Sequence, residues 1–416
     1  MRGCLYFCFL LCFGLCHAGV AQKKYDQIGD YRFPAHKKCV KIPFQLIHNL
    51  VVIPVQINGS QPLNFVVDTG VETAMLTELG FSDSLTLIDP RPLQLRGLGV
   101  GAEVEAMSSA GNVFRFAGLE AQNQPMLVLL NNIFDLSNRL GIQVHGIIGH
   151  SLFKNFVVEI DYAAGFLTLY KPGTYPEKRA RKGTALPLMI EETKPYVKAT
   201  VTLADGSKHP IRLIVDSGMS NSMLLYPPTI PSMALPSRKI NAYLGRGLNG
   251  DIHGYVGRII SLNLGDFVLS NPPVSFPDST AIHFALKLRN RNGNLGADVL
   301  KRFRVVFDYG NSKMLLLPNP HYKSPFHFNL SGLELSAPFP GVHYYTIAAV
   351  LPNSPAYKAG LQKGDALLSI NGVSCTEQTM SQILAFFESK PGKKIRIKAR
   401  RENSEITATL ALQDVI

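Results

Sequence analysis

The sequence is poor in cysteine, and most of its cysteines lie at one end. Of the six cysteines, only Cys39 and Cys375 lie outside the first sixteen residues. Two thiols so far apart in the sequence predict neither a disulfide framework nor a metal-binding cluster. We therefore expect no metal and no cofactor. We also expect the packing of a core to hold the protein together, which a chain of 416 residues permits.

The apolar run near the N-terminus is too short to cross a membrane. The run "CLYFCFLLCFGLC" follows Arg2 and has thirteen residues, whereas a transmembrane helix needs about twenty. Small residues follow in "HAGVAQ", a pattern typical of a secretory signal that is cleaved near Ala18 or Ala21. A lipid anchor on Cys16 is the alternative, although Leu15 is larger than the residue such sites prefer there. We expect residues 1–21 to be a signal peptide. The mature chain would then be exported, periplasmic or extracellular, with no transmembrane segment.

The chain also lacks the usual signatures of nucleic-acid binding, although its net charge is +12. The densest basic patch is "EKRARKG", Glu177 to Gly183, and a solvated loop explains it. There is no zinc-finger spacing, no RNA-binding aromatic signature and no basic helix, so we expect no nucleic-acid partner. A Gly-x-Ser-x-Gly motif is absent too, which argues against serine hydrolysis by that route.

Two stretches of the chain resemble each other around an aspartate. "PLNFVVDTG" runs from Pro62 to Gly70, and "PIRLIVDSG" runs from Pro210 to Gly218. A single motif of this kind arises often by chance and favours only a turn after a strand. Its repetition 148 positions later indicates a duplicated structural unit.

A second pair of stretches repeats at nearly the same spacing. "GIIGHSLFKNFVVEIDY" begins at Gly146, and "GNLGADVLKRFRVVFDY" begins at Gly293. Between the paired stretches lie glycine-rich hairpin candidates, "RGLGVG" and "GRGLNG". Upstream, Asn-Gly and Asp-Gly turns between apolar runs predict strand-turn-strand units. The repeats therefore predict two mostly β lobes, lobe one over residues 40–172 and lobe two over residues 184–319.

Two such lobes, related by a pseudo-twofold axis, can bring Asp68 and Asp216 together at their seam. Two carboxylates about 3 Å apart cannot both ionise readily, so they share one proton and provide a general base and a general acid. Such a pair can activate a water molecule to attack a peptide carbonyl. The motif glycines would let backbone N–H groups approach the carboxylates, and the motif hydroxyls could hydrogen-bond across the seam. These supporting residues are Thr69, Gly70, Ser217 and Gly218.

The stretches "VVDTG", "IVDSG", "GIIG" and "GNLG" resemble those of the pepsin and retropepsin superfamily, most closely the bacterial retropepsin-like aspartyl proteases. The resemblance covers residues 40–319 and implies a two-lobed, duplicated acid-protease β-barrel fold within one chain. It implies that Asp68 and Asp216 are the catalytic pair. It also implies that the glycine-rich hairpins are flaps that close over substrate. The flap candidates are Gly97, Gly99, Gly247 and Gly250.

The sequence departs from that family pattern beside both aspartate motifs. After the motif glycine, pepsin-like enzymes have Ser or Thr and retropepsins have Ala, whereas this chain has Val71 and Met219. In addition, Asn294 replaces the usual apolar residue before Leu295. These departures leave a second hypothesis open, namely a catalytically inactive peptide-binding or scaffold protein.

The stretch "NSPAYKAGLQKGDALLSING" resembles a PDZ domain of the bacterial protease-linked type. A Pro-rich linker from Pro318 to Leu330 leads into it, and strand and helix patterns over residues 326–416 predict a small α+β domain. The resemblance implies that a peptide tail adds as a strand beside Tyr345 to Val350, and that the loop from Pro340 to Tyr344 meets the peptide carboxylate. A module that only packs on the protease lobes is the alternative. The peptide-binding candidates are Tyr344, Tyr345, Thr346 and Ile347.

Together these patterns predict a mainly β protein, an exported aspartic endopeptidase with a PDZ module. Its partners would be peptide or protein substrates, together with peptide tails in the PDZ groove. Because both aspartates lie in one chain, a dimer is not required and we expect a monomer.

Overall fold

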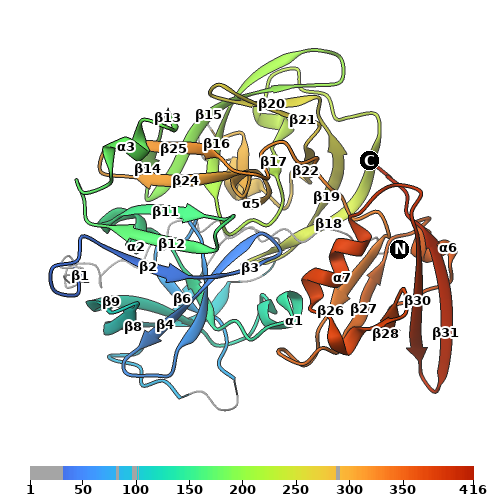
Figure 1. The fold of residues 1–416 in the computed structure, drawn as a ribbon, viewed down its shortest axis with the longest axis horizontal. Coiled ribbons are helices and arrows are strands. Elements are labelled where there is room, and N and C mark those ends of the chain that lie inside the picture. Colours follow the sequence, from blue (N-terminus) through green and yellow to red (C-terminus); the bar gives the residue numbers. More distant parts are fainter. Residues whose placement is uncertain (1–30, 81–83, 96–100, 102, 287–290) are drawn as a thin grey trace.

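The computed structural model of the chain describes residues 31–80, 84–95, 101, 103–286 and 291–416. Lobe one, lobe two and a smaller third unit, drawn in red, are distinct in Figure 1. The structure is mainly β, which confirms the predicted fold class. The predicted signal peptide and the flap candidates Gly97 and Gly99 lie outside the described residues. Within the described part of the chain, no helix has both the length and the apolar character needed to cross a membrane.

The main sheet of lobe one carries the first aspartate motif at its centre. Its strands follow the order β1-β9-β6-β10-β5-β4-β8-β7, and β3 pairs with β4. Strand β5 is apolar except for Asn64, as expected for a central strand, and it ends directly before Asp68. The strands are β1 (Tyr31–Arg32), β3 (Gln45–Ile47), β4 (Leu50–Ile57), β5 (Leu63–Val67), β6 (Ala74–Leu76), β7 (Arg91–Leu95), β8 (Val104–Phe116), β9 (Leu119–Leu129) and β10 (Gly146–Ile148).

Lobe two repeats this plan around the second motif. Its sheet has the order β18-β19-β22-β17-β23-β16-β15-β20-β21, and β14 pairs with β15. In both lobes the motif strand lies parallel to the strand of the Gly-x-x-Gly segment, β5 beside β10 and β16 beside β23. The strands are β14 (Met189–Glu191), β15 (Lys194–Thr202), β16 (Lys208–Asp216), β17 (Met223–Leu225), β18 (Lys239–Gly247), β19 (Gly250–Arg258), β20 (Ser261–Leu264), β21 (Phe267–Ser270), β22 (Pro273–Pro277) and β23 (Gly293–Gly296).

A third sheet joins the two lobes. Strands of lobe one and lobe two meet in the order β13-β25-β24-β11-β12-β2, with the seam at the β11–β24 pair. One apolar cluster continues through this seam and includes Val67, Phe153, Val215 and Phe307. The joining strands are β2 (Cys39–Pro43), β11 (Val157–Asp161), β12 (Phe166–Tyr170), β13 (Thr184–Pro187), β24 (Phe303–Asp308) and β25 (Lys313–Pro318).

The helices of the lobes are short and lie at the ends of strands. Helices α2 and α5 follow the two Gly-x-x-Gly segments directly, so each begins beside a motif loop. The lobe helices are α1 (Leu136–Leu140), α2 (His150–Asn155), α3 (Glu177–Ala180), η2 (Pro227–Thr229), α4 (His283–Leu286) and α5 (Ala297–Leu300).

The third unit has its own sheet and its own apolar core. The sheet order is β26-β27-β28-β30-β31, β29 pairs with β28, and α7 packs its buried residues on the sheet. A capping box at Thr379 and Gln382 fixes the start of α7. The elements are β26 (Leu333–Ser336), β27 (Thr346–Val350), α6 (Pro355–Lys358), β28 (Ala366–Ile370), β29 (Val373–Ser374), η3 (Cys375–Glu377), α7 (Met380–Phe387), β30 (Lys394–Arg401) and β31 (Ser404–Ala411).

The predicted edge strand of this unit is wrong. We expected a peptide to add beside Tyr345–Val350, but β27 has β26 on one side and β28 on the other. Thr346 and Ile347 therefore lie in an inner strand, and Tyr345 is buried with its hydroxyl bonded to Gln378 O. The sequence pattern missed the short strand β26, because only four residues of it are regular.

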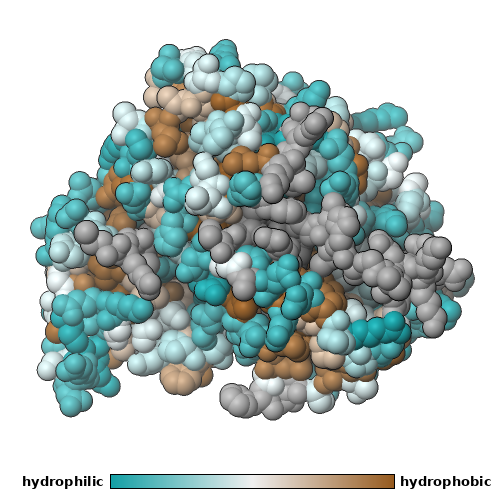
Figure 2. Space-filling model, turned by 180° about the vertical axis from the view of Figure 1, so that it is seen from behind, coloured by the Kyte–Doolittle hydropathy of each residue, from teal (hydrophilic) through white to brown (hydrophobic). Residues whose placement is uncertain are grey.

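The linker between lobe two and the third unit is anchored in both. Phe326 packs into the core shared by the lobes, Phe328 into a lobe-two cluster, and Leu330 into the core of the third unit. The guanidinium of Arg302 lies over the Phe326 ring at 3.5 Å. The surface seen from behind is largely hydrophilic, with separate hydrophobic patches, as expected when the cores lie inside (Figure 2).

Candidate active site

Asp68 and Asp216 meet at the seam between the lobes, at the ends of β5 and β16. Both side chains are fully buried, and the two carboxyl groups are within hydrogen-bonding reach of each other. Asp68 Oδ1 accepts from Gly70 N at 2.6 Å, and Asp216 Oδ2 accepts from Asn294 Nδ2 at 2.6 Å. The other two oxygens, Asp68 Oδ2 and Asp216 Oδ1, have no hydrogen-bond partner among the described residues. Each carboxyl group therefore has one fixed oxygen and one oxygen available to a water molecule or substrate.

The two motif hydroxyls interlock the loops across the seam. Thr69 Oγ1 donates to Val215 O at 2.6 Å and accepts from Ser217 N at 3.0 Å. Ser217 Oγ donates to Val67 O at 2.9 Å and accepts from Thr69 N at 3.0 Å. Four hydrogen bonds thus tie the lobes together directly below the aspartates, which keeps the two carboxyl groups in fixed relative positions.

Glycines allow the backbone to approach the aspartates closely. A Cβ atom on Gly218 would overlap the Asp68 carboxyl group, and one on Gly149 would overlap Asp68 O. Any other residue at these two positions would push the loops apart. This explains why glycine stands both in the motif and at the end of the Gly-Ile-Ile-Gly segment.

The two aspartates have unequal electrostatic surroundings. Burial and the charge of Asp216 raise the pKa of Asp68 well above its usual range. Burial also raises the pKa of Asp216 to about 6, although the Asn294 hydrogen bond and the Arg291 charge oppose this rise. The pair therefore loses its first proton from the Asp216 side and keeps the second on Asp68.

Asn294, a departure from the family pattern, is the residue that fixes Asp216. Its side-chain oxygen accepts from Arg291 Nη2 at 2.7 Å and from Tyr226 Oη at 3.3 Å. The guanidinium of Arg291 lies 5.3 Å from the centre of the Tyr226 ring. All of these groups are buried. Hydrogen bonds connect Arg291 to Asn294 and Asn294 to Asp216, so the Arg291 charge stabilises the Asp216 carboxylate and not that of Asp68.

Lys194 is a buried cation at the aspartate loops that the sequence analysis missed. Its ammonium group donates to Gly70 O, and its charge lowers the pKa of both aspartates. In the other direction, Asn49 Nδ2 of lobe one donates to Ser220 O of lobe two at 2.8 Å. In each lobe, the segment where the turn meets the long strand (β4 in lobe one, β15 in lobe two) therefore contacts the aspartate loop of the other lobe.

A comparison of the repeats could have identified Lys194. Both turns contain two residues with positive φ, His48 and Asn49 in lobe one, and Glu192 and Thr193 in lobe two. The next residue is the apolar Leu50 in lobe one but a lysine in lobe two. A lysine at a position that is buried and apolar in the other repeat is a signal of a special role. Arg291 and Tyr226 offered no comparable signal.

Val71 and Met219 do not hold the loops apart. Both are fully buried in the apolar clusters of their own lobes, Val71 beside Val66 and Met75, and Met219 beside Leu224 and Tyr226. The hydrogen bonds of the interlock keep ordinary lengths next to them. These residues fill core space where related enzymes have small or hydroxyl residues.

The hairpin of lobe two reaches across to lobe one. Gly247 pairs with Gly250 at its tip, and Gly101 N of lobe one donates to Asn249 O. Leu248 at the tip is buried in the lobe-one cluster that contains Val71 and Leu95. The structure therefore shows a closed arrangement, in which the candidate flap of lobe two is packed against lobe one and the aspartates are inaccessible to solvent.

Two family models match this chain. The family model described as aspartyl protease matches residues 53–152 and 197–299, one segment in each lobe. The family model described as PDZ domain matches residues 346–401. A search of the curated proteins finds no match for this chain. The chain therefore carries an aspartyl protease domain in two segments, followed by a C-terminal PDZ domain.

Proposed function

We propose that this protein is an aspartic endopeptidase that hydrolyses peptide bonds with a water molecule activated by Asp68 and Asp216. The observation that carries the proposal is the pair of buried carboxyl groups at the seam, each with one fixed oxygen and one oxygen without a partner among the described residues. A site that needs two carboxyl groups in different protonation states has this arrangement.

The unequal surroundings of the two aspartates support a division of roles. Asp216, with its anion stabilised by Asn294 and Arg291, is the general base, and protonated Asp68 is the general acid. Asp216 takes a proton from the water molecule, and the oxygen of that water attacks the peptide carbonyl carbon. At the same time Asp68 protonates the carbonyl oxygen. In the resulting gem-diol, Asp216 passes its proton to the leaving nitrogen. Asp68 regains a proton from a hydroxyl group as the C–N bond breaks, which yields a carboxylic acid and an amine.

Substrate has to enter through an opened hairpin, because the aspartates are inaccessible in the closed arrangement. Hairpin closure over a bound peptide would exclude water and strengthen the electrostatic interactions in the site. We further propose that the protein is exported, as the N-terminal pattern indicates, and that the PDZ domain binds peptide segments of substrates or effectors.

The test is cleavage of a mixed peptide library between about pH 3 and pH 8 by the mature chain, Asp68→Asn and Asp216→Asn. We expect the parent to cleave and both variants to lose activity, with the acidic limb of the parent near pH 6. Asp266→Asn, in the exposed turn between β20 and β21, is the matched control and should cleave like the parent. Equal behaviour of all four proteins would favour the alternative, an inactive peptide-binding scaffold.

A further inference from the structure

The chain leaves the PDZ domain after β31 and returns to lobe two. Leu412 still belongs to the core of the PDZ domain, whereas Ile416 is buried in a lobe-two cluster and Val415 packs against that cluster. In Figure 1 the red chain crosses from β31 to lobe two and reaches the mark C there. We call Asp414–Ile416 the tail. The tail therefore joins the PDZ domain to lobe two a second time, in addition to the linker.

Asp414 of the tail contacts both strands of the β18–β19 hairpin at its base. Arg238 directly precedes β18, and Arg258 is the last residue of β19. Arg238 Nη2 donates to Asp414 O, and Arg258 Nη2 lies 3.8 Å from Asp414 Oδ2. The Arg258 side chain is only 13% exposed, so solvent screens this ion pair less than an ordinary surface pair. Asp414 therefore bridges the two ends of the hairpin that covers the aspartates.

The apolar part of the tail belongs to the cluster that also holds the body of the hairpin. This cluster contains Leu244 of β18 and Ile252 of β19, together with Met219, which follows the Asp216 motif directly. Ile416 is buried in the same cluster. A hairpin that swings away from the aspartates separates these side chains and exposes them to water. The burial of Ile416 therefore favours the closed arrangement.

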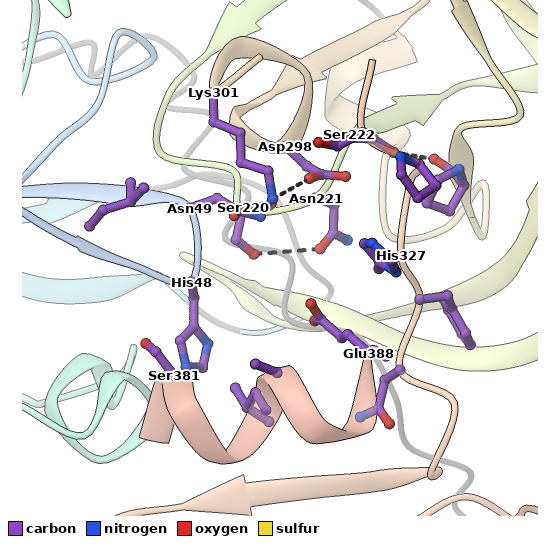
Figure 3. A pocket seen from close by; sticks show the side chains of 18 of the residues that line it. His48, Asn49, Ser220, Asn221, Ser222, Asp298, Lys301, His327, Ser381 and Glu388 are labelled. Atoms are coloured by element: carbon purple, nitrogen blue, oxygen red, sulfur yellow. Dashed lines mark hydrogen bonds and ion pairs between the residues drawn. The ribbon is translucent and has the colours of Figure 1, made fainter. Parts of the chain in front are cut away.

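A cavity of about 480 Å³ interrupts the rest of the interface between the PDZ domain and lobe two. Helix α7 lies on one side of it and Ser220–Ser222 on the other, as Figure 3 shows for Ser381 and Asn221. Val256 and Phe328, which belong to the same apolar cluster as Ile416, also line the cavity. The two domains are therefore not packed together continuously. Domains joined through such limited contacts can move relative to each other.

The PDZ domain is also connected to the hairpin through lobe one. Ala337 N, directly after β26, donates to Asn138 O of helix α1 at 2.8 Å. The next residue of α1, Arg139, donates from Nη2 to Tyr243 Oη of β18 at 3.1 Å. The docked PDZ domain therefore reaches the hairpin by two routes, directly through the tail and indirectly through α1.

We propose that the base of the β18–β19 hairpin is a binding site for the tail, and that the bound tail is an inhibitory strap that restrains hairpin opening while the PDZ domain is docked. The site accepts an acidic residue followed by two branched apolar residues. Movement of the PDZ domain away from the lobes withdraws Asp414 and Ile416 and lets the hairpin open. The regulatory meaning rests on the proposed protease function, because opening matters when substrate has to reach Asp68 and Asp216.

Hydrogen exchange of the full chain tests the strap. Ile416→Ser removes the apolar contact, and Asp414→Arg places a third cation beside the two arginines at the base of the hairpin. We expect amide exchange across residues 239–258 to accelerate about tenfold in each variant, because the closed arrangement loses part of its support. Val373→Ser and Glu377→Arg make the same kinds of change at exposed positions of the PDZ domain and should match the parent.

An acceleration confined to the hairpin supports the strap, whereas unchanged exchange in the folded variants overturns it. Equal acceleration in β15 and β16 overturns it as well, because the tail would then be an ordinary part of the lobe-two core. If the parent cleaves peptides, kcat/KM should rise in both variants, and an unchanged value would refute the inhibitory role. A parent without cleavage, together with faster hairpin exchange in both variants, would refute the protease and retain the strap.

Discussion

Asn294 Nδ2 donates to Asp216 Oδ2 at 2.6 Å, from the strand that lies directly beside the Asp216 strand. Ile147 occupies the matching position of lobe one and has no side-chain donor. Two lobes with the same strand arrangement therefore hold their carboxyl groups in unequal environments. This inequality is what separates a general base from a general acid in a duplicated site.

Replacing Asn294 with leucine should move the acidic limb of the pH–activity profile to higher pH. Without the hydrogen bond the Asp216 anion is less stable, so the pKa of Asp216 rises above its value of about 6 in the parent. We expect an upward shift of about one pH unit and a loss of kcat/KM at pH 6 of about fivefold. The measurement is kcat/KM against pH for the variant and the parent.

Two further variants separate this effect from a general loss of packing. Arg291→Met combined with Asn294→Leu avoids an uncompensated buried charge and should shift the acidic limb upward by more than Asn294→Leu alone, because the Arg291 charge also lowers the pKa of Asp216. Asn263→Leu on β20 makes the same exchange away from the site and should leave the limb unchanged. An acidic limb of Asn294→Leu that coincides with that of the parent would show that Asn294 has only a packing role.

Replacing Lys194 with methionine should shift both limbs of the pH–activity profile upward, the acidic limb through Asp216 and the alkaline limb through Asp68. The Lys194 ammonium lowers the pKa of Asp68 and of Asp216, and methionine retains the apolar stem without the charge. Lys194→Arg should restore most of the activity. Lys198→Met, on the same strand but exposed, is the matched control. If Lys194→Met and Lys198→Met have the same pH profile, Lys194 does not act on the aspartates.

Replacing Asp68 with asparagine should stabilise the folded protein at neutral pH. The pKa of both aspartates is raised by folding, so their contribution to stability is fully present below about pH 4. The contribution of Asp216 is lost as the pH rises through about 6, and that of Asp68 is lost up to a higher pH. Removing the Asp68 carboxyl group should therefore raise the free energy of unfolding at pH 7.5 and change it little at pH 4. Denaturant unfolding at both pH values measures this, with Asp266→Asn as the exposed control. A variant equally stabilised or destabilised at both pH values would contradict the assignment.

The sequence was informative where the chain repeats itself. Each aspartate motif predicts little alone, but two motifs in register predicted two β lobes, and the structure has the same strand arrangement around Asp68 and Asp216. The interlock of Thr69 and Ser217 could be anticipated for the same reason. Contacts that break the pseudo-symmetry, such as those of Lys194 and Asn294, could not, because they depend on which side chain happens to reach across the seam.

The PDZ groove was misplaced for a different physical reason. The longer apolar run at Tyr345–Val350 has the stronger strand signal, and an inner strand has such a run because both of its edges are paired. The true edge strand β26 is short and partly polar, as edge strands often are. The position of a strand within its sheet depends on pairings that local sequence does not encode.

Leu248 should control how readily the site opens. It is buried at the tip of the β18–β19 hairpin in a lobe-one cluster with Val71, so opening of the hairpin exposes it to water. Truncation to alanine removes part of the apolar contact that favours the closed arrangement. For comparison, replacing a fully buried leucine with alanine lowers stability by about 2–5 kcal/mol. Hydrogen exchange across residues 239–258 should therefore accelerate about tenfold or more in Leu248→Ala. Val268→Ala, an exposed residue of the same lobe, should leave this exchange unchanged.

If opening limits substrate entry, kcat/KM of Leu248→Ala rises while the pH limits of activity stay in place, because the aspartates and their partners are untouched. Unchanged exchange in Leu248→Ala would mean that the Gly101–Asn249 contact, rather than Leu248, holds the hairpin closed.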